Sequence, residues 1–578
     1  MDKLLTLAVL ILGIASLFLE QLGVPSFLPG YTTSVIDYLI VALSVIDLII
    51  ELKKAPYPWI YIKRNLLSVL FLVLFLVFFF INKYLQYSEK AFAGNLAFTG
   101  ITGLIVFRNF FMLLKIFTRF RKLNVFLQNI AVHPAHTLVL SFLLVIIAGS
   151  LLLVMPFASA KGETVLSFID ALFTATSAVC VTGLAVADTA VQFSLWGKIV
   201  LLILIQIGGL GIMLLSFSTM FMFRRRVSLE NRMLVSYMIN EDDMTKLSGT
   251  VKRIVYSTFL IEGIGAFVLF WTLPAGNGAI GMRIFNALFH SISAFCNAGF
   301  SLYSDSLESA GNVLSLLSVS ALIILGGLSF SSLFDIRRYL SERMHHQRRK
   351  TGRIESLRIN TRVVLRYTGI LIVTGTFVIY FFEHGNTMES VPVAHQYVHA
   401  FFQSVTLRTA GFNSISFAHL SRPVLLVMIA FMFIGGASGS TAGGIKINTF
   451  AVIIAYVQAF RQRKKVATIY RSEIARDTVI HAFLIFFFGI SLVIAGSLLL
   501  TITEKADFLP LLFETVSAFA TVGLSTGLTT TLSAAGKIVI MVLMFFGRLG
   551  PLTIVAAAGT ERSASVAIRY PEAEISIG

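Results

Sequence analysis

Four segments of this chain repeat one pattern, in which an apolar stretch ends at a glycine that leucine or phenylalanine follows. They align without gaps and read FTATSAVCVTGL (173–184), FHSISAFCNAGF (289–300), FFQSVTLRTAGF (401–412) and FETVSAFATVGL (513–524). Their glycines are 116, 112 and 112 residues apart, at Gly183, Gly299, Gly411 and Gly523. Apolar matches alone arise by chance in a hydrophobic chain, but this regular spacing indicates an internal fourfold repeat.

The chemistry available to such segments is that of the backbone carbonyl. Glycine adopts backbone angles that other residues avoid, so it allows a short helix to run into a loop. Inside a membrane, backbone outside a helix is tolerated where it lines water or an ion path. Four loops around one axis would replace the hydration shell of a bare cation with carbonyl oxygens. The residues that would form this filter are Val181, Thr182, Gly183, Asn297, Ala298, Gly299, Thr409, Ala410, Gly411, Thr521, Val522 and Gly523.

The fourth loop, Thr521-Val522-Gly523-Leu524, is close to the Thr-Val-Gly sequence of potassium-channel filters. This similarity and the gapless alignment favour a cation filter. The alternative interpretation is that the four glycines only break helices in a transporter bundle.

The composition points to the same environment. Of the 578 residues, 56% are hydrophobic and 13% are charged, whereas about a quarter of a soluble domain is charged. The mean hydropathy is +0.85. These values exclude a soluble globular protein, a disordered chain and a disulfide-stapled secreted domain. Cys180 and Cys296 lie inside apolar segments and give neither a metal-ligand spacing nor a disulfide framework.

The basic residues predict the topology. The formal net charge is +17, and the positive charge falls in short blocks between apolar runs, which indicates the positive-inside bias of membrane proteins and not a nucleic-acid partner. The loops 222–253, 335–366 and 460–476 hold 7, 10 and 6 Lys or Arg. We therefore expect these loops and both termini to be cytoplasmic, with the glycine segments entering from outside.

Apolar spans flank each glycine segment. One span precedes it, at about 137–155, 254–274, 365–382 and 479–502, and one follows it, at about 196–222, 313–334, 422–459 and 535–560. The predicted fold is an all-α polytopic membrane protein in which four pseudo-symmetric repeats of helix, pore helix, loop and helix surround a central pore. The predicted domains are an N-terminal four-helix transmembrane bundle (1–130) and pore repeats at 131–253, 254–364, 365–478 and 479–578, the last with a C-terminal tail.

This arrangement resembles the Trk/Ktr/HKT superfamily of potassium transporters, and in particular its TrkH/KtrB-like membrane subunits. The resemblance covers about residues 137–560 and leaves the N-terminal bundle as an extra element, with a voltage-sensing or a structural role left open. It implies potassium uptake through one pore in each protomer, with potassium as the transported ion and no organic cofactor. It also implies a homodimer, a separate cytoplasmic ring of nucleotide-binding regulatory subunits, and a location in the bacterial inner membrane. Glycine at all four filter positions favours potassium over sodium.

The inner span of the third repeat contains FIGGASGSTAGGIKI at 433–447. Each glycine in a helix interior costs about 1 kcal/mol, so we expect the helix to break into an intramembrane loop over 435–444. The alternative is a close-packing helix face made of small residues. The superfamily resemblance implies that this segment is the gate, formed by Gly435, Gly436, Gly439, Gly443, Gly444 and Lys446.

Two arginines occur at membrane depth, where a guanidinium is costly and usually faces the protein interior or water. Arg548 stands where the other three repeats place Gly209, Gly327 and Gly436. We expect its side chain to enter the space that the glycines leave open and to donate to carbonyls of the 435–444 segment, as a barrier to cations or as a purely structural residue. Arg408 is expected to pair with the carboxylate of Glu514.

Potassium uptake is therefore the predicted function. A sodium-permeable or weakly selective transporter of the same fold is the nearer alternative. A membrane-embedded enzyme is the more distant one, because it would need converging acids, histidines or a nucleophile at one depth, and the sequence offers none. The predicted partners of this protein are membrane lipid, a second copy of the chain and the regulatory subunits.

Overall fold

The computed structural model describes residue 46 and residues 134–211, 247–274, 280–309, 311–349, 356–389 and 391–550. The N-terminal bundle predicted over 1–130 and the tail beyond 550 lie outside these described residues. The described chain is almost entirely helical, with one two-stranded antiparallel hairpin formed by β1 (Thr468–Ile469) and β2 (Ser472–Glu473). The helical fold class expected from the sequence is confirmed.

Each repeat has the same three principal helices. The long outer helices are α6 (Pro134–Leu153), α12 (Leu247–Thr272), α16 (Ile359–Glu383) and α20 (Arg476–Thr503). The short pore helices are α7 (Phe168–Val179), α13 (Ile280–Phe295), α17 (Val393–Thr406) and α21 (Phe508–Phe519). The inner helices are α9 (Leu195–Leu210), α14 (Val313–Gly327), α18 (Arg422–Met432) and α22 (Ala534–Leu549).

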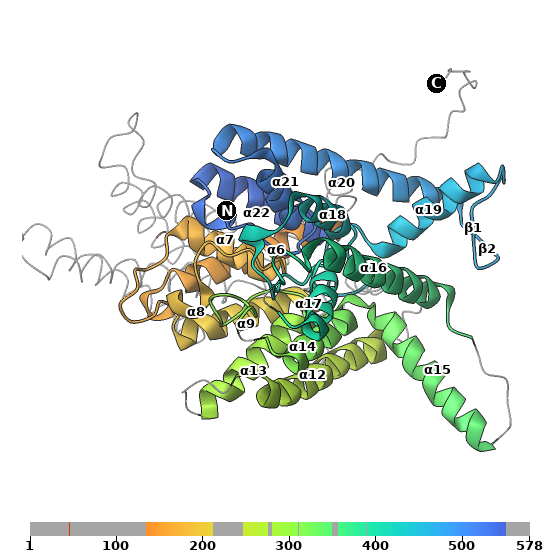
Figure 1. Cartoon of the computed structure of the whole chain (residues 1–578), viewed down its shortest axis with the longest axis horizontal. Helices are drawn as coiled ribbons and strands as arrows, with labels where there is room; N and C mark the ends of the chain where they lie inside the picture. The colour runs from red at the N-terminus through yellow and green to blue at the C-terminus, as the bar shows by residue number, and fades with distance from the viewer. Residues whose placement is uncertain are drawn as a thin grey trace, which may run out of the picture.

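Further elements complete the connections. They are η1 (Pro156–Ala158), α8 (Thr189–Gln192), η2 (Phe417–His419), η3 (Leu528–Thr531), α15 (Phe330–Arg349) and α19 (Ile447–Arg461). Figure 1 shows α15 extending away from the bundle, on the side where the β1–β2 hairpin also protrudes.

The repeats close into a ring around the pore helices. Each pore helix packs against the outer helix of its own repeat and against the inner helix of the preceding repeat. Thus α13 contacts α9, α17 contacts α14, α21 contacts α18, and α7 contacts α22 (Figure 1). The last contact joins repeat four to repeat one, so the four glycine segments face a common centre.

The outer helices carry the membrane-spanning character. Within the described ranges, Gly249–Thr272, Ile359–Glu383 and Arg476–Thr503 are long and apolar enough to cross a membrane by length and composition. Large apolar side chains on them stand exposed, among them Phe267, Trp271, Phe377, Phe381 and Phe487. In water such side chains would need cover, whereas lipid solvates them.

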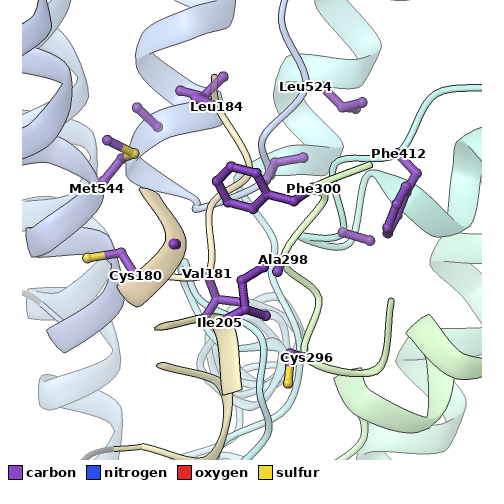
Figure 2. Close-up of a cluster of buried hydrophobic side chains, with 14 of the residues drawn as sticks. Cys180, Val181, Leu184, Ile205, Cys296, Ala298, Phe300, Phe412, Leu524 and Met544 are labelled. Carbon is purple, nitrogen blue, oxygen red and sulfur yellow. The ribbon is translucent and has the colours of Figure 1, made fainter. Parts of the chain in front are cut away.

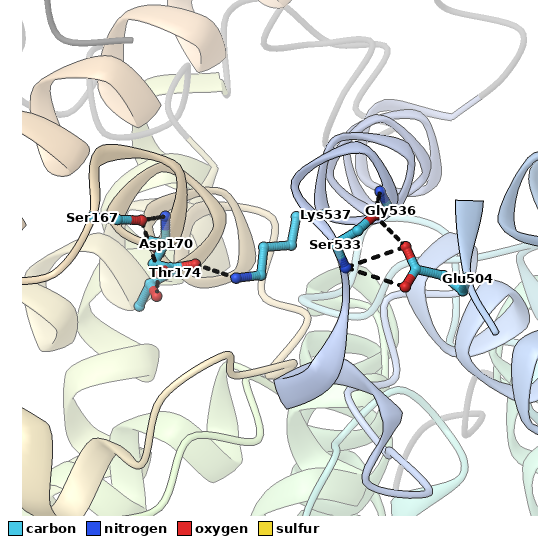
Figure 3. A network of polar contacts seen from close by, with 7 residues as sticks. All are labelled: Ser167, Asp170, Thr174, Glu504, Ser533, Gly536 and Lys537. Atoms are coloured by element: carbon cyan, nitrogen blue, oxygen red, sulfur yellow. Dashed lines mark hydrogen bonds and ion pairs between the residues drawn. The ribbon is translucent and has the colours of Figure 1, made fainter. Parts of the chain in front are cut away.

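A polar contact ties the start of each inner helix to the end of its outer helix. In repeat one, Ser194 Oγ donates to the Phe157 carbonyl in η1, just after α6, and in repeat two Asn312 Nδ2 donates to the Thr272 carbonyl. In repeats three and four a glutamate takes over this role. Glu383 accepts hydrogen bonds from the backbone nitrogen and hydroxyl of Ser421, and Glu504 accepts the same pair of bonds from Ser533 (Figure 3). The helix N-terminus and the carboxylate therefore stabilise each other.

The inner span predicted over 313–334 is wrong as a single helix. It breaks after Gly327, and α14 and α15 meet at a bend of 104°. Ser329 accepts the backbone N–H of Ser332, as an N-cap residue does, and starts α15. The freed carbonyl of Gly327 accepts a hydrogen bond from the backbone N–H of Ala437. The break in repeat two therefore provides a binding point for the third repeat.

An ion pair joins the first and fourth repeats. Lys537 Nζ of α22 lies 2.6 Å from Asp170 Oδ1 of α7, with side chains 16% and 25% exposed (Figure 3). Ser167 caps α7 by accepting the backbone N–H of Asp170, and its hydroxyl donates to Asp170 Oδ2. The carboxylate is thus fixed before it meets the lysine, which lowers the entropy cost of the pair.

We expect a double-mutant cycle of Asp170→Asn and Lys537→Gln to give a coupling energy of about 1 kcal/mol, near the upper end for partly exposed pairs. The measurement is the thermal unfolding of each purified variant in the same detergent. Arg338 and Glu342, 4.0 Å apart with side chains 35% and 37% exposed, form the control pair, for which we expect coupling near zero. Equal coupling in both pairs would show that the Lys537 contact does not help to close the ring.

Candidate functional site: four glycine loops and an intramembrane loop

The four glycine loops, residues 181–183, 297–299, 409–411 and 521–523, share one backbone conformation. Their first residues have positive φ angles of 57°, 58°, 69° and 52°, at Val181, Asn297, Thr409 and Thr521. Their glycines have φ angles of 95°, 70°, 79° and 89°. A side chain disfavours this left-handed region, yet the first position carries valine, asparagine or threonine there, so the backbone angle alone does not explain the glycine at the third position.

The glycines pack against one another in a closed sequence. A Cβ atom added to Gly183 would lie 2.5 Å from the Ala298 carbonyl oxygen, and one added to Gly299 would lie 2.7 Å from the Ala410 carbonyl oxygen. The same atom on Gly411 would lie 2.6 Å from the Val522 carbonyl oxygen, and on Gly523 it would overlap the Thr182 carbonyl oxygen. Each loop therefore touches the next, and the fourth touches the first. The structure brings the sequence-predicted glycines together into one ring.

Serine side chains hold three of the loops from behind. Ser177 Oγ accepts the backbone N–H of Gly183 at 3.0 Å, and Ser517 Oγ accepts that of Gly523 at 3.1 Å. Ser293 Oγ donates to the Phe300 carbonyl at 2.8 Å. These serines stand six residues before the glycine, and their agreement is visible in the aligned segments, although sequence reasoning overlooked it.

The third loop is held differently. Val405 occupies the serine position, and the Ala410 nitrogen donates to the Thr406 carbonyl. In the other repeats the equivalent nitrogen donates to the serine carbonyl one residue earlier, from Thr182, Ala298 and Val522. The side-chain amide of Asn297 in the second loop lies beside the Arg408 carbonyl, so the second and third loops are in contact at this point.

Apolar side chains anchor the outer ends of the loops. The residues that follow the glycines are at most 1% exposed, at Leu184, Phe300, Phe412 and Leu524. Figure 2 shows Leu184 and Leu524 at one end of the loops and the thiols of Cys180 and Cys296 at the other. Both cysteines are free and buried, consistent with small packing residues at the ends of the pore helices.

The inner helix of repeat three breaks as expected. α18 ends at Met432, α19 begins at Ile447, and residues 433–446 form the intramembrane loop between them. Its neck is closed by backbone hydrogen bonds from Gly435 to Ile445 and from Ile447 to Gly436, at 2.8 and 2.9 Å. The alternative of a continuous helix with a small-residue face is therefore wrong.

This intramembrane loop lies directly against the glycine loops. A Cβ on Gly443 would overlap the side chain of Thr521, and one on Gly435 would lie 3.4 Å from Thr409 Cγ2. Thr441 Oγ1 donates to the carbonyls of Phe295 and Gly326 at 3.1 and 2.9 Å. The loop thus sits against the first residues of two glycine loops and is held by the second repeat.

Arg548 connects three repeats. Its Nη1 donates to the Thr441 carbonyl of the intramembrane loop, and its Nη2 donates to the Gly208 carbonyl at the end of α9. Lys446 Nζ donates to the Ala442 carbonyl at 2.7 Å, across the same loop. The contact between Arg548 and the loop, expected from the repeat comparison, is present.

Two sequence expectations about charged residues need correction. Glu514 accepts hydrogen bonds from Ser525, Thr526 and Thr529 of its own repeat, so it does not pair with Arg408. Nε and Nη2 of Arg408 have no hydrogen-bond partner among the described residues. Two of the three glycines at the Arg548 position do not leave open space either, because Cys296 fills the side of Gly209 and Ala442 that of Gly436, whereas a Cβ on Gly327 would meet only Asn297 at 3.6 Å.

Comparison with known proteins agrees with this geometry. The sequence model of the TrkH family, described as a cation transport protein, matches residues 104–566. The chain belongs to the TrkH family. It is therefore a cation transport protein and not an enzyme, and as a family member it is a multi-pass membrane protein. Residues 1–103 lie outside the matched region.

Several curated relatives cover most of the family region. The chain is 41% identical over 445 residues to the Ktr system potassium uptake protein B of Vibrio alginolyticus, which covers 76% of this chain and 94% of the relative. It is 40% identical to the protein of the same name from Bacillus subtilis, over 77% of this chain and 97% of the relative. It is 36% identical to the potassium/sodium uptake protein NtpJ of Enterococcus hirae, over 77% of this chain and 97% of the relative.

A solved structure shares the fold. The crystal structure of the potassium transporter TrkH from Vibrio parahaemolyticus superposes with a TM-score of 0.60 and 18% sequence identity. The match covers 85% of this chain and 97% of that chain. The chain therefore shares its fold with the TrkH structure.

We expect serine in place of Gly183, Gly299, Gly411 or Gly523 to weaken discrimination against sodium, because the new Cβ must displace a carbonyl of the neighbouring loop. The measurement is the ratio of rubidium to sodium uptake at matched expression. Gly162→Ser is the matched control, since Gly162 also has a positive φ, of 93°, but has nothing within 4 Å of an added Cβ. Unchanged selectivity in all four variants would remove the glycine ring from any role in ion choice.

Proposed function

We propose that this chain takes up potassium through a selectivity filter made of its four glycine loops, with Val181–Gly183, Asn297–Gly299, Thr409–Gly411 and Thr521–Gly523 as the ion-binding residues. The closed ring of glycine-to-carbonyl contacts supports this proposal. The carbonyls of the residues before the glycines lie along the ring, where they can replace the water shell of a cation. The membrane potential would drive entry with about 2.3 kcal/mol per charge per 100 mV.

The names of the relatives support potassium as the ion. The two Ktr proteins are named potassium uptake proteins, and glycine is present in all four loops. The Enterococcus relative is named a potassium/sodium uptake protein. This name keeps a sodium-permeable or weakly selective pore as the second candidate, which a direct comparison of the two ions separates.

We further propose that the intramembrane loop is the gate, with Gly435, Gly436, Gly439, Gly443, Gly444, Lys446 and Arg548 as its functional residues. The loop lies against the first residues of the third and fourth glycine loops. Its neck is pinned but its tip rests on a few hydrogen bonds to α14 and α13. Movement of the tip would open the path without disturbing the filter.

The assembly proposed from the superfamily resemblance is a homodimer in the bacterial inner membrane, with both termini in the cytoplasm and a cytoplasmic ring of nucleotide-binding regulatory subunits. The relatives named as parts of a Ktr system support more than one kind of subunit. Residues 1–130 would add a transmembrane bundle to this assembly.

Ion flux from proteoliposomes that contain only this chain tests the proposed function. We expect potassium and rubidium to enter when a negative interior potential is applied, and sodium to enter more slowly. Equal rates for sodium and potassium would favour the weakly selective alternative. Empty liposomes and liposomes with heat-denatured protein give the background.

Removing the arginine barrier should speed transport. We expect Arg548→Ala to raise rubidium uptake about fivefold, because a buried positive charge repels the entering cation more strongly than in water. Arg548→Lys should retain only part of the closure, since lysine lacks the planar fork that reaches the Thr441 and Gly208 carbonyls together. If alanine abolishes transport in a folded protein, the arginine supports the structure of the pore and the barrier hypothesis fails.

Weakening the contacts of the intramembrane loop should also raise the rate of transport. We expect deletion of residues 438–441, which leaves the paired neck intact, to raise flux and reduce its dependence on the regulatory subunits. Thr441→Val, which removes only the two hydroxyl contacts to Phe295 and Gly326, should give a smaller rise. Ser440→Ala is the control, because that hydroxyl bonds to Ala437 within the loop. Reduced flux in both folded test variants would count against gating.

A further inference from the structure

A buried carboxylate lies behind the second glycine loop. Glu262 of α12 is 2% exposed. Gln206 Nε2 of α9 donates to both of its oxygens, at 3.1 and 3.3 Å, and Cys296 Sγ lies 3.8 Å from Glu262 Oε1. Cys296 directly precedes Asn297, the first residue of the loop. Glu262 therefore joins the outer helix of repeat two, the inner helix of repeat one and the end of a pore helix.

The other repeats show that packing does not require a carboxylate here. Equivalent positions on the four outer helices can be recognised from one glycine in each. A Cβ added to this glycine would meet an inner-helix side chain that stands five residues before Gly209, Gly327, Gly436 or Arg548. The four outer-helix glycines are Gly149, Gly265, Gly375 and Gly496. Three residues before them stand Ile146, Glu262, Ile372 and Val493. The three aliphatic residues are 3%, 8% and 7% exposed. Repeat two thus places an acid where its counterparts bury an aliphatic side chain.

The partner side chain is exceptional in the same way. Gln206 stands three residues before Gly209, and the equivalent residues are Ile324, Phe433 and Phe545. A buried polar pair in place of two apolar residues is seldom favourable for stability, because desolvation opposes it. Such a pair is therefore more informative about function than about folding.

The surroundings of Glu262 connect it to the helix end that Arg548 holds. Ion pairs in the described part of the chain involve Asp170, Asp335 and Glu342, so Glu262 is bonded to Gln206 and Cys296 and not to a basic side chain there. Arg548 bonds the Gly208 carbonyl, two residues along α9 from Gln206. The Glu262–Gln206 pair therefore lies close along α9 to the contact between the first and fourth repeats.

We propose that Glu262 is a positioning residue of the cation pathway: through Gln206 and Cys296 it fixes the inner end of the second glycine loop. The proposal rests on the proposed function of the glycine loops. Gly209 packs directly on the Cys296 thiol, so the same cluster connects the second loop to the segment of α9 that Arg548 holds. Ser291 Oγ donates to the Glu262 carbonyl at 2.7 Å and fixes this part of α12 against the pore helix.

The test uses Glu262→Gln, which keeps the shape but leaves one accepting oxygen in place of two, and Glu262→Ile, the residue type that repeats one and three bury at this position. The full chain is reconstituted in proteoliposomes, and the potassium concentration for half-maximal uptake and the rubidium-to-sodium ratio are measured. We expect the half-maximal concentration to rise about fivefold in the isoleucine variant and less in the glutamine variant, because isoleucine removes every contact to Gln206 and Cys296. A fivefold change corresponds to about 1 kcal/mol, the contribution of one hydrogen bond. Thermal unfolding of the isoleucine variant should occur at or above the wild-type temperature.

Glu504→Gln is the control, because this carboxylate also accepts hydrogen bonds, but they come from Ser533 at the start of α22 and not from a residue beside a glycine loop. It should lower the unfolding temperature and leave the half-maximal concentration unchanged. Wild-type potassium dependence and selectivity in both folded Glu262 variants would overturn the inference. A wild-type chain that carries no potassium would instead defeat the proposed function, so the two failures are distinguishable.

Discussion

The packing of each filter glycine against a carbonyl of the next repeat is the constraint on which the structure depends. Four left-handed glycines leave no room for a Cβ between neighbouring loops, and each loop can hold its shape only while the next is in place. The helices serve this contact. Pore helices deliver the loops, the inner helix of the preceding repeat supports each pore helix, and buried serines fix three of the four loops from behind.

The residues with proposed functions lie where the four repeats differ from one another. A symmetric ring of carbonyls suits a spherical ion, but it cannot by itself open and close. One inner helix is interrupted by the intramembrane loop, one glycine position carries Arg548, one outer helix carries Glu262, and the turn after one pore helix carries Arg408. Each exceptional residue stands where its counterparts are small or apolar, so symmetry provides the reference from which a specialised residue can be recognised.

The sequence predicted the parts whose signal is local. Glycine spacing identified the four loops, and the glycine-rich run at 433–447 identified the broken helix. The break at Leu328 escaped notice because an apolar run continues through it, and only the capping role of Ser329 marks a new helix. The pairing of Arg408 with Glu514 was wrong because opposite charge does not decide between neighbours. Ser525 and Thr529, close in the chain, already satisfy that carboxylate.

The role of Glu262 could not be read from one sequence in advance, since it depends on knowing which outer-helix residues are equivalent. The structure supplies that register through the contacts of the outer-helix glycines with the inner helices. The order of the repeats, by contrast, followed from the spacing of the glycines, although the expected boundaries at 253/254, 364/365 and 478/479 fall inside α12, α16 and α20. The periodicity of the sequence was therefore enough to predict the fourfold repeat. Three-dimensional contacts were needed to find which side chains differ from their counterparts in the other repeats.

If the four glycine loops form a filter, they bind one bare cation together. The anomalous X-ray signal of rubidium in crystals of the protein would show this directly. We expect a site on the axis of the ring, coordinated by carbonyl oxygens of Thr182, Ala298, Ala410 and Val522 from all four repeats. Rubidium coordinated by the loop of a single repeat, or a ring that stays empty in crystals saturated with rubidium, would contradict it.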